Sequence, residues 1–335
     1  MTEPGLAGRS AWVLTEGHAG MEGPARALAE ALGLDATVKR VRAPGAWGWL
    51  PAPLWPRRLA LEGGRGDRLD PPWPDLLIAC GRRSVAPALA VREASRRTGG
   101  PGTFTVYVQD PRIDPARFDL VIAPAHDRVA GANVVACLGS LNGLTPERLD
   151  AAAEAARARF ATLPRPLAAV LVGGPSRAYR MGGAEMRVLG ERLAALALAT
   201  GCGLAAVPSR RTGAANLAAL RGSLAGSGAY LWDGTGDNPY LGLLALADAL
   251  IVTCDSVNMT TEAAATGKPV YVAMFEGRSA RFEAFHGAMR ANGHTRPFEG
   301  RIDFAWRPAP LRETERVAAE VARRYRAARG SASLP

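Results

Sequence analysis

The sequence has few cysteines, lysines and histidines. The scarcity of cysteine and histidine excludes several kinds of protein and site. Its four cysteines are scattered singly over 335 residues, which excludes a disulfide-rich secreted domain and a paired-cysteine metal site. The four histidines include no HExxH pair, so we expect no metal ion. No apolar run reaches the roughly 18 residues of a membrane-spanning helix, and the first residues lack the pattern of a secretion signal. We therefore expect a cytosolic protein with reduced thiols.

The net charge of +10 comes almost entirely from arginine. Lys39 and Lys268 are the only lysines, so arginine supplies 39 of the 41 basic residues. Together with 38 glycines and abundant alanine, this bias is typical of a GC-rich genome and weakens the charge as an argument for any partner. A basic balance can indicate nucleic-acid binding, but for this reason we expect no nucleic-acid partner here.

What the sequence does contain is an alternation of short apolar runs with longer helical patterns. Hydrophobic residues make up 48% and charged residues 21% of the chain, which is a globular composition. Strands that alternate with helices indicate βαβ units and a mostly parallel sheet. In the first half the pattern predicts strands at 11–15, 75–80, 104–108, 120–123 and 133–136, and helices at 24–32, 82–97 and 146–161.

A proline-rich break at 163–166 separates this half from a second one, where the pattern restarts. Five further strands predict a second doubly wound sheet. They are expected at 167–172, 203–207, 229–232, 249–253 and 269–273, with helices at 184–199, 214–220, 239–247 and 259–266 and a basic helix at 312–329. We therefore expect two Rossmann-like α/β domains, 1–163 and 164–310, that face each other across a cleft, and a C-terminal helix and tail at 311–335.

An open parallel sheet binds its ligand at the carboxyl ends of its strands, and the most specific loop at such a position is 253–263. This run, TCDSVNMTTEA, follows an apolar strand and opens a helix. Exposed N–H groups at a helix N-terminus form a site for a phosphate or diphosphate. Glu262 lies within the first turns, where its carboxylate could accept two ribose hydroxyls. The alternative is that Ser256 or Asp255 caps the helix and Glu262 is a favourable first-turn acid.

Three more loops carry small or polar residues after a strand. Gly173-Gly174-Pro175-Ser176 permits close approach of a ligand, although glycine also serves plain turns. In Ser209-Arg210-Arg211-Thr212, two arginines beside hydroxyls can clamp a phosphate or lie in a solvated basic loop. Asn238 can cap the next helix or hold a ligand. Four such loops at one sheet edge favour a nucleotide site, although none is a GxGxxG fingerprint or a P-loop.

The first half offers candidates for a general base. Glu16 and His18 lie two residues apart in the turn after the first strand, and Asp110 follows another strand. A carboxylate or an imidazole at such a place can accept a proton near neutral pH when its environment is suitable. His126 beside Asp127 is a further candidate. The alternative for each is a structural role, and no GxSxG elbow indicates a hydrolase.

The segment between Asp35 and Glu62 contains no acid and is rich in tryptophan and arginine. Indoles and guanidinium groups on a loop suit a membrane interface with anionic lipid. The alternative is a loop packed over the domain core. The candidate membrane or acceptor residues are Trp47, Trp49, Trp55, Arg57 and Arg58.

Several of these motifs together resemble the mitochondrial-fission ELM family. The resemblance runs from about residue 11 to residue 300 and is carried by QDPR (109–112), FDLVIAPAHD (118–127), LVGGPSRAYR (171–180), SRRT (209–212), DNPY (237–240), VTCDSVNMTTEA (252–263) and TGKPVYV (266–272). That family is similar to glycosyltransferases of the GT-B fold, including lipid-linked ones. The resemblance implies a C-terminal domain that binds a sugar nucleotide, with a helix-start turn at the diphosphate and a glutamate on the ribose, and an N-terminal acceptor domain. The first loop departs from the family pattern DGKAGHENQ.

The resulting hypothesis is a metal-independent GT-B glycosyltransferase that needs no cofactor beyond its nucleotide-diphosphate sugar. The acceptor would be a hydroxyl, lipid- or envelope-linked, and the protein would lie in the cytoplasm, with peripheral contact to the inner face of the membrane. The alternatives are a non-catalytic scaffold that binds a protein partner or a membrane, and a sugar-nucleotide epimerase. The expected donor residues are Gly173, Gly174, Ser176, Arg177, Ser209, Arg210, Arg211, Thr212, Asn238, Ser256, Val257, Asn258, Met259, Thr260 and Glu262, and the expected bases are Glu16, His18 and Asp110.

Overall fold

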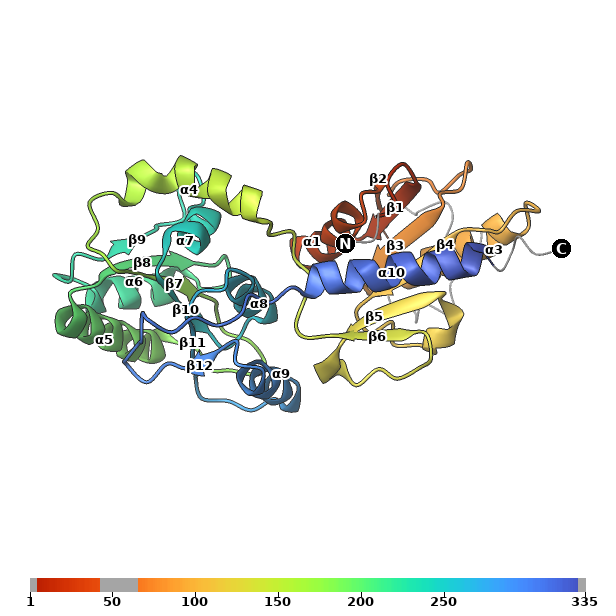
Figure 1. The fold of residues 1–335 in the computed structure, drawn as a ribbon. Helices are drawn as coiled ribbons and strands as arrows, with labels where there is room; N and C mark the ends of the chain where they lie inside the picture. Colours follow the sequence, from red (N-terminus) through yellow and green to blue (C-terminus); the bar gives the residue numbers. More distant parts are fainter. Residues whose placement is uncertain (1–4, 43–65, 331–335) are drawn as a thin grey trace. The chain divides into compact units, whose positions relative to one another are not determined.

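The computed structural model describes residues 5–42 and 66–330 and divides into two compact units (Figure 1). Unit 1 comprises Met1–Gly143 and Arg312–Pro335, and unit 2 comprises Leu144–Leu311. Each unit holds a six-stranded sheet in which all paired strands are parallel. The fold class expected from the alternating pattern, two doubly wound α/β sheets, is confirmed.

The sheet of unit 1 has the strand order β2-β1-β3-β4-β5-β6. Its strands are β1 (Ser10–Thr15), β2 (Asp35–Arg40), β3 (Leu76–Cys80), β4 (Phe104–Val108), β5 (Leu120–Pro124) and β6 (Val134–Cys137). The central strands β3, β4 and β5 are buried along their whole length, as apolar runs covered on both faces must be. Strand β2 was not predicted, because it lies at the sheet edge and its residues are exposed or half-buried.

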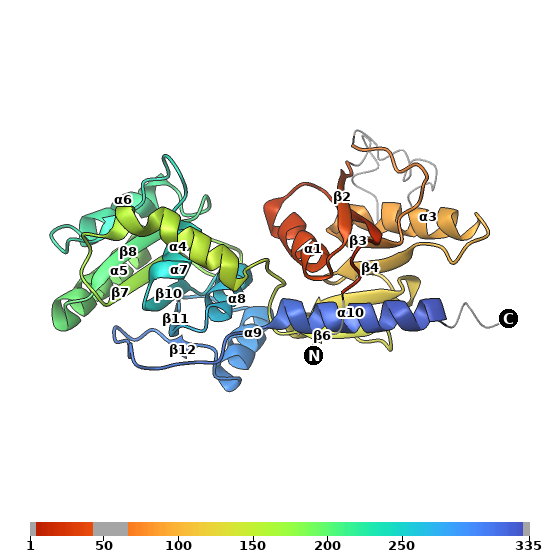
Figure 2. The ribbon, with the colours of Figure 1, turned by 45° about the horizontal axis from the view of Figure 1, so that its top comes forward.

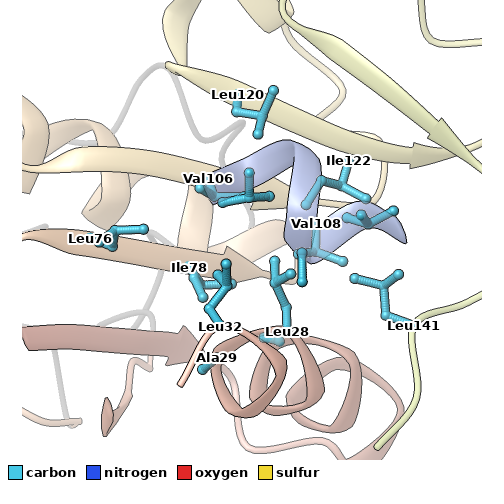
Figure 3. Packing of buried hydrophobic residues seen from close by; sticks show 14 of the residues in the cluster. Leu28, Ala29, Leu32, Leu76, Ile78, Val106, Val108, Leu120, Ile122 and Leu141 are labelled. Atoms are coloured by element: carbon cyan, nitrogen blue, oxygen red, sulfur yellow. The ribbon is translucent and has the colours of Figure 1, made fainter. Parts of the chain in front are cut away.

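Helices cover both faces of this sheet. Helices α1 (Ala19–Ala31) and α10 (Glu313–Gly330) lie on one face, and α3 (Val85–Arg96), which follows the short helix η3 (Arg82–Ser84), lies on the other. Figure 3 shows Leu28 and Leu32 of α1 directed toward the strands that carry Ile78 and Val108. The predicted start of α1 at residue 24 was wrong: the helix begins at Ala19, and Pro24 lies inside it.

The C-terminal helix α10 belongs to unit 1 and is not a separate tail element. Figures 1 and 2 both show it lying along the unit 1 sheet. Val317, Val321 and Tyr325 are buried in the same core cluster as α1 and the strands. Tyr325 packs edge-on against Phe104 with ring centroids 5.6 Å apart. The expected segment 311–335 therefore differs from the observed one, because the apolar stripe of this basic helix completes the core of unit 1.

The sheet of unit 2 has the strand order β12-β11-β10-β7-β8-β9. Its strands are β7 (Leu167–Val172), β8 (Gly203–Pro208), β9 (Tyr230–Leu231), β10 (Ala249–Thr253), β11 (Val270–Ala273) and β12 (Arg296–Pro297). Strand β12 was not predicted, since it has only two residues and both are exposed. Read from β9, this is the dinucleotide-binding order 3-2-1-4-5-6, and the direction of the connections reverses between β7 and β10.

Two helical layers enclose the unit 2 sheet. One core cluster joins it to α5 (Gly183–Thr200), α6 (Ala214–Ser223) and α9 (Ala280–Ala291), and the other joins it to α4 (Pro146–Phe160), α7 (Tyr240–Leu246) and α8 (Val257–Ala265). Helix α4 was expected in the N-terminal domain, but Phe160 is buried in the unit 2 core. The observed division therefore lies at residues 143 and 144 and not near 163.

Candidate functional site

The switch point of the unit 2 sheet lies where β7 and β10 pair side by side. Gly173 and Gly174 follow β7, and Cys254, Asp255 and Ser256 follow β10 before α8 begins. Crevices at such switch points, outside the carboxyl ends of the strands, are where doubly wound folds bind ligands. These two loops therefore border the candidate ligand crevice of unit 2.

Asp255, which the sequence suggested only as a possible helix cap, connects the loops of three strands. Its side chain is fully buried and accepts a hydrogen bond from the Thr253 hydroxyl at 2.7 Å and from the Gly174 N–H at 3.1 Å. The Arg211 guanidinium donates to the same carboxylate at 2.6 Å. Thr253 in turn accepts the Gly173 N–H at 2.7 Å. The loops after β7, β8 and β10 are thus held as one rigid platform.

The packing of the platform requires glycine at both positions 173 and 174. A Cβ on Gly173 would lie 2.1 Å from the Asp255 carboxylate, and one on Gly174 would lie 2.1 Å from the Arg211 carbonyl oxygen. Both distances are far below a van der Waals contact. The glycine pair therefore permits close approach of neighbouring loops, whereas the sequence analysis had considered close approach of a ligand.

The loop after β8 holds two arginines with different surroundings. Arg211 is engaged by Asp255 and lies half exposed. Arg210 is exposed, and within the described residues it has no hydrogen-bond or ion-pair partner. Thr212 is buried and donates to the Val172 carbonyl at 3.1 Å, while Ser209 lies 3.3 Å from the Thr212 hydroxyl. Of the four residues in this loop, Arg210 is the one left available to a ligand, and Thr212 is structural.

The N-terminus of α8 offers unpaired backbone donors. Ser256 is the N-cap, and its hydroxyl accepts the Met259 N–H at 3.2 Å. The Thr260 N–H pairs with the Ser256 carbonyl at 3.2 Å. The N–H groups of Val257 and Asn258 have no acceptor in the part of the chain that the structure describes. The expected cap at Ser256 is confirmed, and the anion site at the two unpaired amides stays a prediction.

Glu262 lies partly buried one turn further along α8, beside α7. The Tyr240 hydroxyl donates a hydrogen bond to its Oε2. Burial raises the pKa of the Glu262 carboxyl above its usual range, and the hydrogen bond from Tyr240 only partly offsets this. Burial, together with the neighbouring Glu262 charge, also raises the pKa of Tyr240. The second carboxylate oxygen has no partner among the described residues, so it can accept a hydroxyl from a ligand.

The remaining predicted donor residues are spread around this centre. Asn238 accepts the Tyr240 N–H at 3.0 Å, but it lies one residue before Pro239, the N-cap of α7, so it supports the start of this helix without being its cap. Ser176 accepts the N–H groups of Ala178 and Tyr179, each at 3.2 Å, and holds its own loop. Arg177 is exposed beside it, with no partner in the described ranges.

His286 supports the site from α9 and was not assigned by sequence analysis. It is 1% exposed, and its Nε2–H donates to the Cys254 carbonyl at 2.8 Å. Burial lowers the pKa of the imidazole below its usual value of 6.5. No spacing in the sequence relates residue 286 to residue 254, so only the packing of α9 against the end of β10 could reveal this contact.

The three candidate bases lie at the corresponding edge of the unit 1 sheet. Glu16 follows β1, and its carboxylate accepts the Arg83 N–H at 2.9 Å and lies 3.6 Å from the Arg83 guanidinium. Asp110 accepts the Arg112 N–H at 2.8 Å and pairs with its guanidinium at 3.0 Å. His18 is the exposed N-cap of α1 and makes no capping hydrogen bond with its side chain. Its imidazole is therefore the least engaged of the three.

Two further expectations concern membranes and metals. Trp47, Trp49, Trp55, Arg57 and Arg58 lie outside the described residues. Helices long and apolar enough to cross a membrane are absent from residues 5–42 and 66–330. The same ranges contain no cluster of three or more histidine, cysteine or acidic side chains that could hold a metal ion.

Comparison with known proteins identifies relatives over most of the chain. A family model described as Mitochondrial fission ELM1 matches residues 19–325. The Arabidopsis thaliana protein named Mitochondrial fission protein ELM1 is 33% identical over an alignment of 284 residues, and the match covers 77% of this chain and 65% of that protein. The chain therefore matches slightly less than two thirds of that relative's length.

Solved structures with a similar fold include two sugar-nucleotide enzymes. The UDP-GlcNAc 2-epimerase of Methanocaldococcus jannaschii has a TM-score of 0.54 at 12% identity, over 93% of this chain and 99% of that chain. The UDP-GlcNAc 2-epimerase of Neisseria meningitidis, solved bound to UDP-GlcNAc, has a TM-score of 0.50 at 13% identity, over 94% of this chain and 93% of that one. At such identity the likeness concerns the fold alone, and it confirms the expected GT-B-like fold.

Proposed function

The chain belongs to the mitochondrial fission ELM1 family, and from this premise and its GT-B-like fold we propose that it is a glycosyltransferase. The donor is a nucleotide-diphosphate sugar, and the acceptor is a hydroxyl on a lipid- or envelope-linked molecule. One observation supports the donor half above all others: the start of α8 combines two N–H groups without an acceptor among the described residues, at Val257 and Asn258, with the Glu262 carboxylate less than two turns away.

In this proposal unit 2 binds the donor. The diphosphate lies at the Val257 and Asn258 amides, where hydrogen bonds and the helix dipole stabilise negative charge. Glu262 accepts the ribose hydroxyls through its second oxygen. Arg210 approaches the phosphates as a mobile cation, while Arg211 stays paired with Asp255. The positive end of α8 and the guanidinium group then stabilise the charge that develops on the leaving diphosphate.

Unit 1 supplies the acceptor side of the reaction. His18 is the base that we favour, because Glu16 and Asp110 are each held by an arginine. The imidazole takes the proton of the acceptor hydroxyl as that oxygen attacks the anomeric carbon. The segment with Trp47, Trp49 and Trp55 serves as the contact to the lipid or membrane, as its composition suggests.

Calorimetry with UDP, GDP and CMP tests the donor half, and ribose recognition makes the test specific. We expect wild type to bind the preferred nucleotide about tenfold more tightly than its 2′-deoxy counterpart, as a hydrogen bond to a charged group predicts. Glu262→Gln should lose most of this discrimination, whereas Tyr240→Phe, which keeps the carboxylate, should retain it. If no nucleotide binds, or if Glu262→Gln discriminates as well as wild type, the donor half is wrong.

Turnover of labelled sugar nucleotides in a lipid extract tests the reaction. His18→Ala should abolish transfer and leave nucleotide affinity unchanged, because His18 lies in unit 1. Nucleotide binding without any turnover would instead identify a non-catalytic scaffold. Conversion of the donor without any acceptor would identify an epimerase, so product analysis is done with and without lipid.

Liposome sedimentation tests the membrane contact separately. Replacing Trp47, Trp49 and Trp55 together by alanine should release the protein from vesicles that contain anionic lipid. Unchanged sedimentation of this triple variant would remove the membrane from the proposal and leave the donor half untouched.

A further inference from the structure

The loops that follow β7 and β11 meet across the carboxyl end of β10. Strand β10 lies between β11 and β7 in the sheet, yet Tyr179 and Gly277 form an antiparallel bridge. The Arg180 N–H also donates to the Glu276 carbonyl at 2.9 Å. Because neighbouring strands lie about 4.8 Å apart, two loops joined in this way span the width of the intervening strand. We call residues 175–182 and 276–278 the strap.

Close approach of the two loops is built into the backbone. Gly277 has a φ of 149°, and a Cβ there would lie 2.0 Å from the Ala178 carbonyl oxygen. Tyr179 is buried at the root of the strap and packs on Phe282 with ring centroids 5.3 Å apart. Phe282 stacks in turn on His286, which binds the Cys254 carbonyl. The strap is therefore anchored to the same turn that leads into α8.

The strap residues line a pocket of about 600 Å³ that is widely open to solvent. Its charged lining residues are Arg177, Arg180 and Arg278 with one acid, Glu276. Arg180 is occupied, since it pairs with Glu276 and, at 3.2 Å, with Glu185. Arg278 has only a 3.8 Å contact with Glu283 between two exposed side chains, which is worth little in water.

Two guanidinium groups, those of Arg177 and Arg278, are thus available to a ligand in this pocket. Arginine donates up to five hydrogen bonds and accepts none, so such a pair suits a carboxylate better than neutral sugar hydroxyls. The Ser176 hydroxyl is no acceptor for these two guanidinium groups, because it already accepts two backbone N–H groups. The proposed function places the diphosphate at the start of α8. A ligand that also fills the strap pocket would therefore carry a second anionic group there.

We infer that the strap pocket binds the carboxylate of the donor sugar, and hence that the donor is a nucleotide-diphosphate uronic acid. The inference rests on the proposed function, because it assigns the sugar of the same donor. It adds a specificity role for Arg177 and Arg278 that is separate from the binding of nucleotide and diphosphate.

Matched ligand pairs test this inference, since they differ only in the group at C6. Calorimetry compares UDP-glucuronate with UDP-glucose, and GDP-mannuronate with GDP-mannose, against UDP and GDP alone. We expect wild type to bind one of the acidic sugars at least tenfold more tightly than its neutral counterpart. The double variant Arg177→Gln/Arg278→Gln should reduce that ratio to about one, with the affinity for the bare nucleotide unchanged.

The control is Arg187→Gln/Arg221→Gln, which removes the same charge from exposed arginines outside the pocket lining. It should keep the preference for the acidic sugar, and thermal unfolding verifies that both double variants fold. Equal affinity of wild type for acidic and neutral sugars overturns the inference and leaves the proposed function standing. Weaker binding of bare UDP or GDP by the pocket variant also overturns it, because the arginines then hold the diphosphate. If no nucleotide binds at all, the proposed function itself fails.

Discussion

The pair of neighbouring arginines at 210 and 211 provides a stringent test of the platform around Asp255. Arg211→Ala removes the cation that pairs with this carboxylate, whose side chain is fully buried. Arg210→Ala removes the same side chain one residue earlier, where no described partner is lost. The two variants have the same composition and the same net charge, so any difference in stability reports the contact with Asp255.

The expected difference follows from what Arg211→Ala leaves behind. Removing one member of a buried ion pair costs about 3–5 kcal/mol because the other charge stays buried. Arg211 is itself 48% exposed, so water can reach the vacated position. The bonds from Thr253 and Gly174 to Asp255 also remain. We therefore expect a loss of about 2–3 kcal/mol for Arg211→Ala and less than about 0.5 kcal/mol for Arg210→Ala.

Differential scanning calorimetry measures the effect, since it resolves separate transitions when two units unfold independently. For a unit of this size the expected loss lowers Tm by roughly 4–12 °C. A double-mutant cycle with Asp255→Asn should show strong coupling with Arg211→Ala and none with Arg210→Ala. Equal stability of the two arginine variants would refute the reasoning, because Asp255 would then be stabilised without its cation.

Three further predictions concern single residues of unit 2. Burial lowers the pKa of Lys268 from 10.5 to about 8, so the unfolding free energy should rise by about 3 kcal/mol between those pH values, and Lys268→Met should flatten that rise in urea titrations. Burial also lowers the pKa of His286 below 6.5. Because the unfolded chain then binds the proton at a higher pH than the folded chain, the free energy of unfolding should fall as the pH drops below about 6.5. The free energy of unfolding of His286→Gln, whose side chain can still donate to the Cys254 carbonyl, should fall less steeply. Gly173→Ala should lower the free energy of unfolding by at least about 2 kcal/mol, because the new Cβ overlaps Asp255. Gly183→Ala at the start of α5, where a Cβ has room, should be neutral or stabilising. Equal effects of the two substitutions would contradict the packing argument.

The buried strands were the most predictable part of the fold. Strands such as β7 and β10 are continuous apolar runs of five or six residues, because both faces of a parallel sheet are covered. Strands β2 and β12 escaped prediction because they lie at sheet edges, where exposed residues carry no apolar signal. Helix α9 escaped as well, since only three of its twelve residues, Phe285, His286 and Met289, are buried.

Domain assignment was less predictable than the elements themselves. Helix α4 is followed by a proline-rich break, which made it look like the end of the first domain, but Phe160 is buried in the second. Helix α10 is continuous in sequence with unit 2 but completes unit 1. Sequence proximity says nothing about which core an apolar stripe joins, because burial depends on shape and partner and not on chain order.

The sequence by itself determined that two parallel sheets form and which loops follow their strands. That followed from local rules: strand and helix periodicity, helix caps such as Ser256, and the fact that parallel strands end at one edge. Only the tertiary structure decided which of these residues remain available. Arg211 is held by Asp255 and Arg210 is not, and Tyr240 shares the Glu262 carboxylate. These pairings join residues 22 and 44 positions apart, so they depend on how the helices and strands pack, which local sequence patterns do not encode.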